Sequence, residues 1–202
     1  MTAIKMCGLT SSVDIITVNN LMPEYIGFVF YKKSKRYIDL RSAKYLKQYL
    51  SPKIKAVGVF MNERPETIAE LLNTGVIDAA QLHGNETDEE MIKLKTLTDK
   101  MVIQAFRING KEDAIRAEKS LADIILLDAG AGDGKTFDWS LIRKIRRPYF
   151  LAGGLNSENV REAIRILKPL GVDVSSGIET DGRKDKEKMA AFTAAVRKED
   201  KE

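Results

Sequence analysis

Two side chains that can exchange protons stand at the ends of apolar runs in this sequence. Cys7 ends the run AIKMC, and Asp128 ends the run IILLD. A thiol and a carboxyl can serve as general base and general acid when their surroundings adjust their pKa values. Gly8 follows Cys7 and lets the chain turn without crowding the thiol. The pair predicts proton-transfer chemistry, provided that the fold brings both residues to one site.

The surroundings expected for these two groups favour such roles. Side chains alternate along a strand, so Lys5 and Cys7 share a face, and an ammonium beside the thiol would favour the thiolate over an unperturbed pKa of about 8.5. Asp128 follows IILL, where burial would raise the pKa of a carboxyl and keep it protonated. Taken singly, Cys7 could be a small buried apolar residue and Asp128 could cap a loop.

Eight short apolar or β-branched runs alternate with segments of helical spacing, at intervals of roughly 20 to 25 residues. This repeat predicts an α/β fold, a single-domain (β/α)8 TIM barrel over residues 1–197 followed by a charged, frayed tail at 198–202. A doubly wound open sheet also alternates, but it needs only five or six strands. The expected strands are AIKMC, YIGFVF, IKAVGVF, AAQLH, MVIQAF, IILLD, YFLAG and VDVSSG.

Several helix ends are marked by capping residues. Pro65 fits the first turn of a helix that Gly75 ends, and TDEE at 87–90 can form a capping box. Asp138 can cap a helix over WSLIRKI, and Asn156 or Ser157 can cap ENVREAIRIL.

In a barrel of this kind the active site lies where the strands end. The first and sixth strands are three steps apart in a ring of eight, so Cys7 and Asp128 would face a substrate from nearly opposite sides. Arg36 could grip a carboxylate, although YKKSKR also suits a solvated basic loop, and His83 could be a structural histidine.

A phosphate group could be held in one of two places. The segment AGAGDGKT at 129–136 resembles a phosphate-binding P-loop, but Ala129 replaces the first glycine and the next helix starts too late to face the phosphate. The turns after the seventh and eighth strands are better candidates, because many barrels bind phosphate there with backbone amides. Their residues are Gly153, Gly154, Ser176 and Gly177.

The composition narrows the class of protein. The 202 residues are 44% hydrophobic and 31% charged, with a net charge of +4, and no apolar run approaches the ~20 residues that span a bilayer. One cysteine and one histidine exclude an internal disulfide and make a poor zinc site. We therefore expect a cytoplasmic enzyme, a monomer or homodimer, that binds a phosphorylated small molecule and neither nucleic acid nor membrane.

The ordered motifs KMCGLT, GFVFYKKSKRYI, VGVFMNE, QLHGNE, LLDAG with GDGKTFDW, LAGGLNSENV and VDVSSGIE closely resemble those of the phosphoribosylanthranilate isomerases. The resemblance covers the whole chain except the charged tail. It implies an Amadori rearrangement of N-(5'-phosphoribosyl)anthranilate to 1-(2-carboxyphenylamino)-1-deoxyribulose 5-phosphate in tryptophan biosynthesis, without metal or cofactor.

The resemblance also implies roles for individual residues. Asp128 is similar to the general acid that opens the ribose ring, and Cys7 to the base that removes the C2' proton. Arg36 is similar to the arginine that binds the anthranilate carboxylate, and His83 to a substrate contact. The two glycine turns match the phosphate site.

Two other functions stay open at this stage. A related isomerase of histidine biosynthesis performs the same rearrangement, but an Asp is expected there in place of Cys7. A non-catalytic phosphate-binding barrel, or an RNA-binding module that uses KKSKR, is the second alternative.

Overall fold

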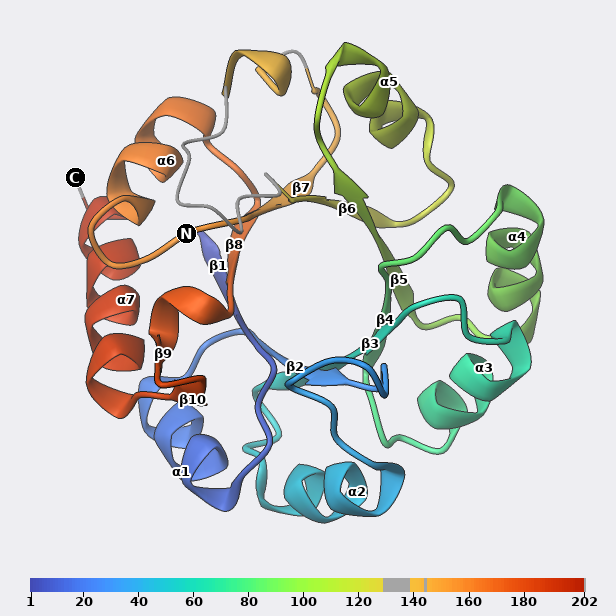
Figure 1. Ribbon diagram of the computed structural model, residues 1–202, viewed down its shortest axis with the longest axis horizontal. Helices are drawn as coiled ribbons and strands as arrows, with labels where there is room; N and C mark the ends of the chain where they lie inside the picture. The colour runs from blue at the N-terminus through green and yellow to red at the C-terminus, as the bar shows by residue number, and fades with distance from the viewer. Residues whose placement is uncertain (129–138, 144, 202) are drawn as a thin grey trace.

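The computed structural model describes residues 1–128, 139–143 and 145–201. Eight parallel strands form a closed barrel in chain order, and the helices surround it (Figure 1). The ring closes where β1 pairs with β8, with Lys5 opposite Asp173. The (β/α)8 prediction is confirmed, and the open sheet is excluded. The strands are β1 (Ala3–Cys7), β2 (Tyr25–Val29), β3 (Lys55–Phe60), β4 (Ala79–Leu82), β5 (Met101–Arg107), β6 (Ile124–Asp128), β7 (Tyr149–Ala152) and β8 (Gly171–Val174).

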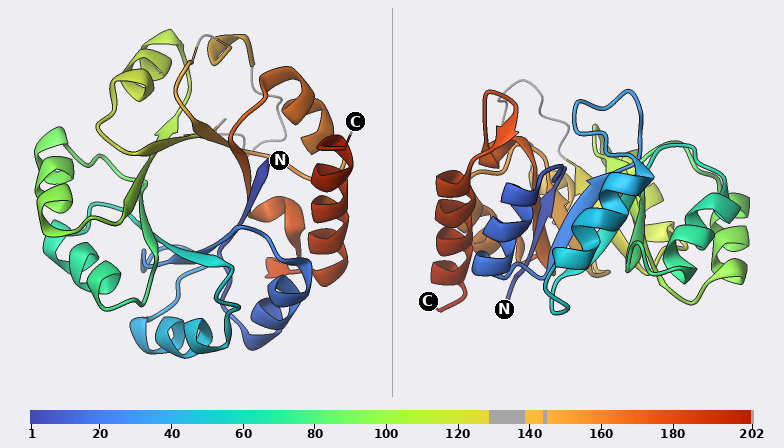
Figure 2. Two further views of the ribbon diagram at one scale, coloured as in Figure 1. Left: turned by 180° about the vertical axis from the view of Figure 1, so that it is seen from behind. Right: turned by 90° about the horizontal axis from the view of Figure 1, so that it is seen from below.

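Helices follow most of the strands and cover the outside of the barrel. They are α1 (Ser12–Leu21), α2 (Leu40–Tyr49), α3 (Pro65–Asn73), α4 (Asp88–Leu97), α5 (Lys111–Lys119), α6 (Val160–Leu167) and α7 (Lys186–Glu199). Between β8 and α7 the chain forms a 3-10 turn, η2 (Ser176–Ile178), and a small hairpin of β9 (Glu179–Thr180) and β10 (Arg183–Lys184). This insertion lies outside the ring of strands, between α7 and α1 (Figure 1), at the end of the barrel where the strands finish (Figure 2).

The capping signals predicted two of the helix starts correctly. Thr87 accepts a hydrogen bond from the backbone N–H of Glu90, whose side chain accepts from the N–H of Thr87, as in a capping box. Pro65 begins α3, and Gly75 follows its end with a φ of +74°. Asn156 Oδ1 accepts from two backbone N–H groups of the turn that leads into α6, so that helix begins at Val160, later than expected.

The helix predicted over WSLIRKI is wrong for the part of that segment that the structure describes. Only a 3-10 turn, η1 (Trp139–Leu141), is present there, and Asp138 lies outside the described residues. Pro148 biases Arg147 toward an extended backbone, which limits the length available to a helix. So short a helix gains too few hydrogen bonds to repay its nucleation.

Apolar side chains fill the barrel at the end where the strands begin. Val57, Leu126 and Phe150 form a fully buried cluster there, and Tyr25 meets Phe150 edge to face at 5.5 Å. Figure 2 (right) shows both chain ends on this side and the loops after β2 and β8 on the opposite side. Because packing closes one end, only the end where the strands finish is open to a ligand.

The last helix fastens the two ends of the chain together. Asp200 accepts hydrogen bonds from the N–H and the hydroxyl of Thr2, and Arg197 pairs with Glu24 at 2.7 Å. These contacts hold α7 against the first strand. The domain boundary at 197 and the fraying of 198–202 stay predictions.

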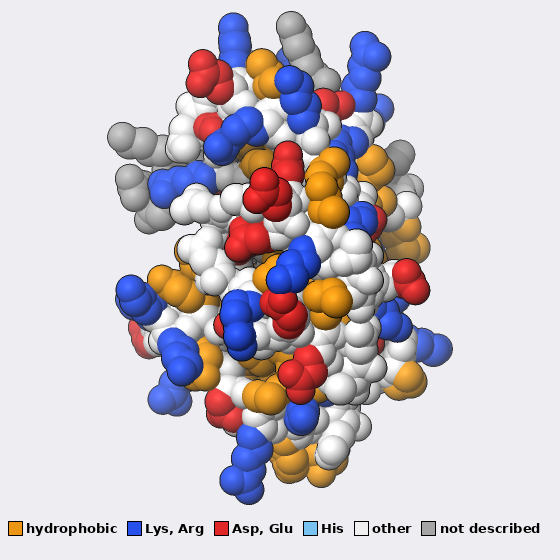
Figure 3. Space-filling model, turned by 90° about the vertical axis from the view of Figure 1, so that its right-hand side faces the viewer, with side chains coloured by type: hydrophobic (Ala, Val, Ile, Leu, Met, Phe, Trp, Pro, Cys, Tyr) orange, Lys and Arg blue, Asp and Glu red, His pale blue; other side chains and the backbone are white. Residues whose placement is uncertain are grey.

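Charged side chains of both signs share the outer surface. On the face shown in Figure 3, which carries α3 and α4, basic and acidic groups are interspersed. Among the described residues, no helix is both long enough and apolar enough to cross a membrane.

Candidate active site

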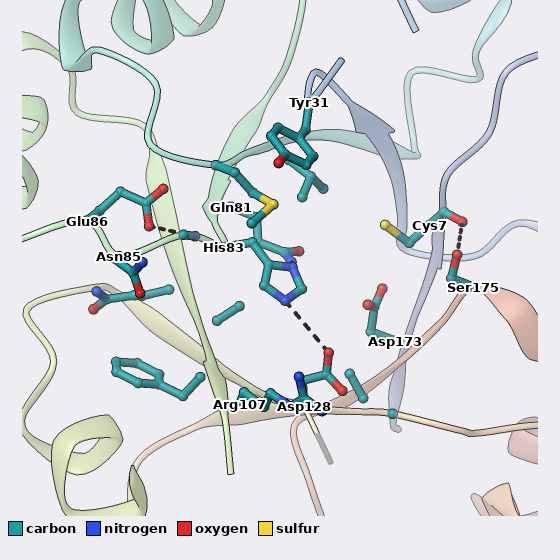
Figure 4. Close-up of a pocket in the computed structure, with 18 of the residues that line it drawn as sticks. Cys7, Tyr31, Gln81, His83, Asn85, Glu86, Arg107, Asp128, Asp173 and Ser175 are labelled. Atoms are coloured by element: carbon teal, nitrogen blue, oxygen red, sulfur yellow. Dashed lines mark hydrogen bonds and ion pairs between the residues drawn. The ribbon is translucent and has the colours of Figure 1, made fainter. Parts of the chain in front are cut away.

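A cavity of about 1160 Å³ opens at the carboxyl ends of the strands (Figure 4). It lies where the barrel rule predicts an active site. Cys7 and Asp128 reach it from β1 and β6, on different sides of the pocket. The predicted site residues that line it are Cys7, Arg36, His83, Asp128, Gly153, Gly154 and Ser176, whereas Gly177 does not line it.

The Cys7 side chain is closely packed among apolar side chains. Its side chain packs with Val29 and Val59, and the residue is 8% exposed. Gly27 on the neighbouring strand provides the space, because a Cβ there would come within 2.7 Å of the Cys7 sulfur. The thiol is therefore held in one place and shielded from water.

A buried ion pair lies directly beneath the thiol. Lys5 is fully buried, and its Nζ lies 2.8 Å from Asp173 Oδ1. Burial lowers the pKa of Lys5, but the charges of Asp173 and Cys7 outweigh burial and raise it, so Lys5 stays cationic. The expectation that Lys5 shares a face with Cys7 agrees with this arrangement.

The net shift in the pKa of Cys7 is upward, although Lys5 by itself lowers this pKa as expected. Burial raises the pKa of Cys7 above its ordinary value, Lys5 lowers it, and the Asp173 carboxylate raises it again. Burial dominates because a thiolate loses its hydration among apolar side chains. Cys7 is thus a thiol at neutral pH, and the thiolate that forms from it is a strong base.

Replacing Asp173 by asparagine is expected to lower the pKa of Cys7, because a negative charge near the thiolate is removed while an acceptor for Lys5 remains. Cys7 is the single cysteine, so its rate of alkylation by iodoacetamide against pH reports this pKa alone. The midpoint should move to lower pH. A midpoint that stays in place or rises would contradict the assignment, and Lys5→Met, which removes the cation, should move it upward.

Asp128 is accompanied by a histidine on the cavity wall. His83 Nε2 lies 3.7 Å from Asp128 Oδ2, close enough for an ion pair and too far for a direct hydrogen bond. The Asp128 side chain is 27% exposed, so the predicted protonation of this carboxyl by burial stays a prediction. The structure thus places His83 beside the candidate acid, where it can also meet a substrate.

Gln81 is a polar residue of this site that the sequence reasoning missed. It is 1% exposed, and its Nε2 lies 3.2 Å from His83 Nδ1. Its Oε1 has no hydrogen-bond partner among the described residues. A buried carbonyl without a partner is costly, so this oxygen is suited to accept a hydrogen bond from a ligand hydroxyl or N–H. Its place in the apolar run AAQL was the signal.

The turns after β7 and β8 form one continuous wall. Gly153 and Gly154 have φ values of 93° and 64°, the left-handed region that favours glycine. The backbone N–H groups of Gly154 and Ser176 make no hydrogen bond to another described residue, and both residues line the cavity. Unpaired amides of this kind form a cradle for an anion such as phosphate.

Replacing Gly177 by alanine is expected to force these two turns apart, because the new Cβ would lie 1.9 Å from the carbonyl oxygen of Leu155. We expect a loss of stability of about 1–3 kcal/mol and weaker inhibition by inorganic phosphate. Denaturant unfolding and the phosphate inhibition constant measure the two effects. Gly110→Ala is the matched control, since its Cβ meets no atom within 4 Å. Unchanged phosphate inhibition in Gly177→Ala would argue against the cradle.

Arg36 reaches the cavity from the loop after β2, and its guanidinium is already engaged. Nε and Nη2 donate to the two carboxylate oxygens of Glu179, each at 2.7 Å. Sequence reasoning placed Arg36 in the site but missed Glu179, which belongs to the β9–β10 hairpin outside the ring of strands (Figure 1). The P-loop-like segment at 129–136 lies outside the described residues.

A barrel whose open end combines two proton-exchanging groups with an anion cradle is typical of isomerases and lyases that act on sugar phosphates. The family model described as N-(5'-phosphoribosyl)anthranilate (PRA) isomerase matches residues 4–195. The chain therefore belongs to the N-(5'-phosphoribosyl)anthranilate isomerase family.

Relatives that carry this family's name support the assignment over the full length. The chain is 42% identical to N-(5'-phosphoribosyl)anthranilate isomerase of Acetivibrio thermocellus, with 99% of this chain and 98% of that protein covered. It is 44% identical to the enzyme of Lacticaseibacillus casei over 95% of this chain and 93% of that protein.

Solved structures agree. The phosphoribosyl anthranilate isomerase of Thermotoga maritima superposes with a TM-score of 0.90 at 40% identity, covering 98% of this chain and 100% of that one. A phosphoribosyl anthranilate isomerase in complex with reduced 1-(o-carboxyphenylamino)-1-deoxyribulose 5-phosphate gives a TM-score of 0.88 at 39% identity, covering 98% and 100%.

Proposed function

We propose that this barrel isomerises N-(5'-phosphoribosyl)anthranilate to 1-(2-carboxyphenylamino)-1-deoxyribulose 5-phosphate, with Asp128 as general acid and Cys7 as general base. The observation that carries the two roles is their placement on different sides of one cavity, on β6 and β1. The enzyme would serve tryptophan biosynthesis in the cytoplasm, and it would need no cofactor because both steps are proton transfers.

The first step opens the ribose ring. Asp128 gives its proton to the ring oxygen, the bond between C1' and that oxygen breaks, and the nitrogen lone pair forms a C1'=N bond. The neighbouring His83 Nε2, 3.7 Å from Asp128 Oδ2, can steady the carboxylate that results.

The second step moves a proton from C2' to C1'. The reacting form of Cys7 is the thiolate, a minor form at neutral pH that the buried Lys5 ammonium stabilises. This thiolate removes the C2' proton, and the electron pair of that bond forms C1'=C2' while the C1'=N electrons return to nitrogen. The enolamine then loses the proton of its C2' hydroxyl to Asp128 and gains one at C1' from the Cys7 thiol. Both residues recover their starting states, and the burial that raises the pKa of Cys7 makes its thiolate a strong enough base.

Three groups would hold the substrate for these steps. The amides of Gly154 and Ser176 face the phosphate, and Arg36 faces the carboxylate on the aromatic ring. The ligand of the related complex described above carries both a phosphate and a carboxylate, so a site of this kind has to bind two anionic groups. We further propose that the chain works as a monomer or a homodimer; the Thermotoga maritima relative is described as dimeric.

The decay of anthranilate-type fluorescence tests the reaction. Freshly prepared N-(5'-phosphoribosyl)anthranilate is mixed with the protein, and indole-glycerol-phosphate synthase removes the product. We expect enzyme-dependent decay that the synthase carries through to indole glycerol phosphate. Decay absent from the folded protein, together with turnover of the aminoimidazole ribonucleotide of histidine biosynthesis, would replace the proposed substrate.

A further inference from the structure

Three charged side chains pack together behind the mouth of the barrel. Glu179 receives the Arg36 guanidinium on both of its oxygens at 2.7 Å, and Lys184 Nζ lies 2.5 Å from Glu179 Oε1. The side chains of Glu179 and Lys184 are 8% and 3% exposed. Charge-assisted bonds that are shielded from water hold their geometry more firmly than surface pairs.

The Glu179 carboxylate binds Arg36 from the side away from the main cavity. Arg36 lines both the main cavity and a second cavity of about 480 Å³, whereas Glu179 and Lys184 line only the second. Glu179 takes Nε and Nη2, so Nη1 keeps its two donors for a partner elsewhere. Gly8 supports this pose, because a Cβ there would come within 2.4 Å of Arg36 Cδ.

Lys184 leaves the cluster of Arg36, Glu179 and Lys184 with a net positive charge that can attract an anion. A carboxylate paired with Arg36 alone would cancel the charge of the guanidinium. With Lys184 on the same carboxylate, two cations share one anion, and the cluster has a net charge of +1. Burial lowers the pKa of Lys184, while Glu179 opposes that shift by stabilising its charged form.

Lys184 also connects this cluster to the loop after β8. Its Nζ donates to the carbonyl oxygen of Ser175 at 2.9 Å, and the Ser175 hydroxyl donates to the carbonyl oxygen of Cys7 at 3.1 Å. The β9–β10 hairpin thereby joins the loop that carries Ser176 to the loop that carries Arg36. A change at Lys184 would remove the bonds to Ser175 directly, whereas a change at Glu179 leaves Lys184 with its Ser175 partner, so Glu179 is the better position for testing the effect on Arg36.

We propose that Glu179 is a positioning residue that fixes Arg36 for the carboxylate of the aromatic ring and so sets the preference for a carboxylated aniline. The proposal rests on the proposed function, in which Arg36 binds that carboxylate. It assigns Glu179 no contact with the substrate and no proton transfer.

Replacing Glu179 by glutamine is expected to raise KM for N-(5'-phosphoribosyl)anthranilate about 10-fold or more and to change kcat far less. The variant loses the charge-assisted bonds that hold Arg36, so Arg36 binds the substrate carboxylate more weakly, whereas Cys7 and Asp128 are unchanged. The dissociation constant of the reduced product analogue should rise by a similar factor, and that of inorganic phosphate should stay the same. Glu179→Asp retains the charge on a shorter side chain, so its KM should lie between those of the parent protein and Glu179→Gln. It replaces Glu179→Gln in the test if the glutamine variant does not fold.

Two further variants make the result decisive. Glu24→Gln is the matched control, since Glu24 forms an equivalent pair with Arg197 at the other end of the barrel and its loss should leave KM unchanged. In an Arg36→Ala background, Glu179→Gln should weaken the analogue no further. If Arg36→Ala weakens the analogue and Glu179→Gln does not, the positioning role is overturned while the function stands. If Arg36→Ala has no effect, the carboxylate site itself is wrong.

Discussion

Replacing Cys7 by serine is expected to lower kcat at least 100-fold while the protein keeps its fold. A positioned general base typically contributes about 10²- to 10⁴-fold, and a serine hydroxyl in the same place is far too weak an acid to form the anion needed to remove the C2' proton. Steady-state fluorescence assays measure kcat. Because serine is slightly smaller and fits beside Gly27, the surrounding packing should stay intact.

The affinity of the Cys7→Ser variant provides the control. The dissociation constant of the reduced product analogue should stay near that of the parent protein, because the phosphate cradle and Arg36 are untouched. A variant that binds the analogue normally and turns over at a near-normal rate would remove Cys7 from the mechanism.

Asp128→Asn is expected to lower kcat by a comparable factor of at least 100. An amide of nearly the same shape can accept and donate hydrogen bonds, but it cannot give a proton to the ring oxygen and recover it later. The loss should appear in kcat more than in KM. Retention of most of the activity would show that another group opens the ring.

His83 supplies the comparison for that variant. It lies 3.7 Å from Asp128 and would act only by steadying the carboxylate, so His83→Gln should lower kcat less than Asp128→Asn. A larger loss at His83 than at Asp128 would reverse the two roles.

The barrel and the strand-end positions of Cys7 and Asp128 followed from sequence pattern alone. Runs that end in Cys7 and Asp128 became β1 and β6 with the expected ends, because alternating strands and helices of this number have few ways to bury their apolar faces. The helix over WSLIRKI failed because local periodicity competes with Pro148 and with the short length available.

The partners of the site residues were harder to predict. Lys5 and Asp173 were each visible as a charge within an apolar strand, and ring closure of β1 on β8 sets them side by side. Recognising that pair required the register between the two strands, which sequence does not specify. Glu179 and Arg36 are 143 residues apart and meet only because the β9–β10 hairpin lies against the loop after β2.

The balance of pKa effects at Cys7 also needed the structure. Sequence showed that Lys5 shares a face with the thiol, and its charge does lower the pKa of Cys7. The opposing effect is larger because Val29 and Val59 exclude water from the same place. The direction of a shift thus depends on packing from strands that are distant in sequence.

The measurement that tests the acid–base account most directly is the kinetic isotope effect on kcat for substrate carrying deuterium at C2'. In Cys7→Ser, removal of the C2' proton limits the rate, so the account predicts a large primary effect. In Asp128→Asn, ring opening precedes that step and limits the rate, so the effect should be close to 1. The opposite pattern, or equal effects in the two variants, would contradict the assignment of Cys7 as base and Asp128 as acid.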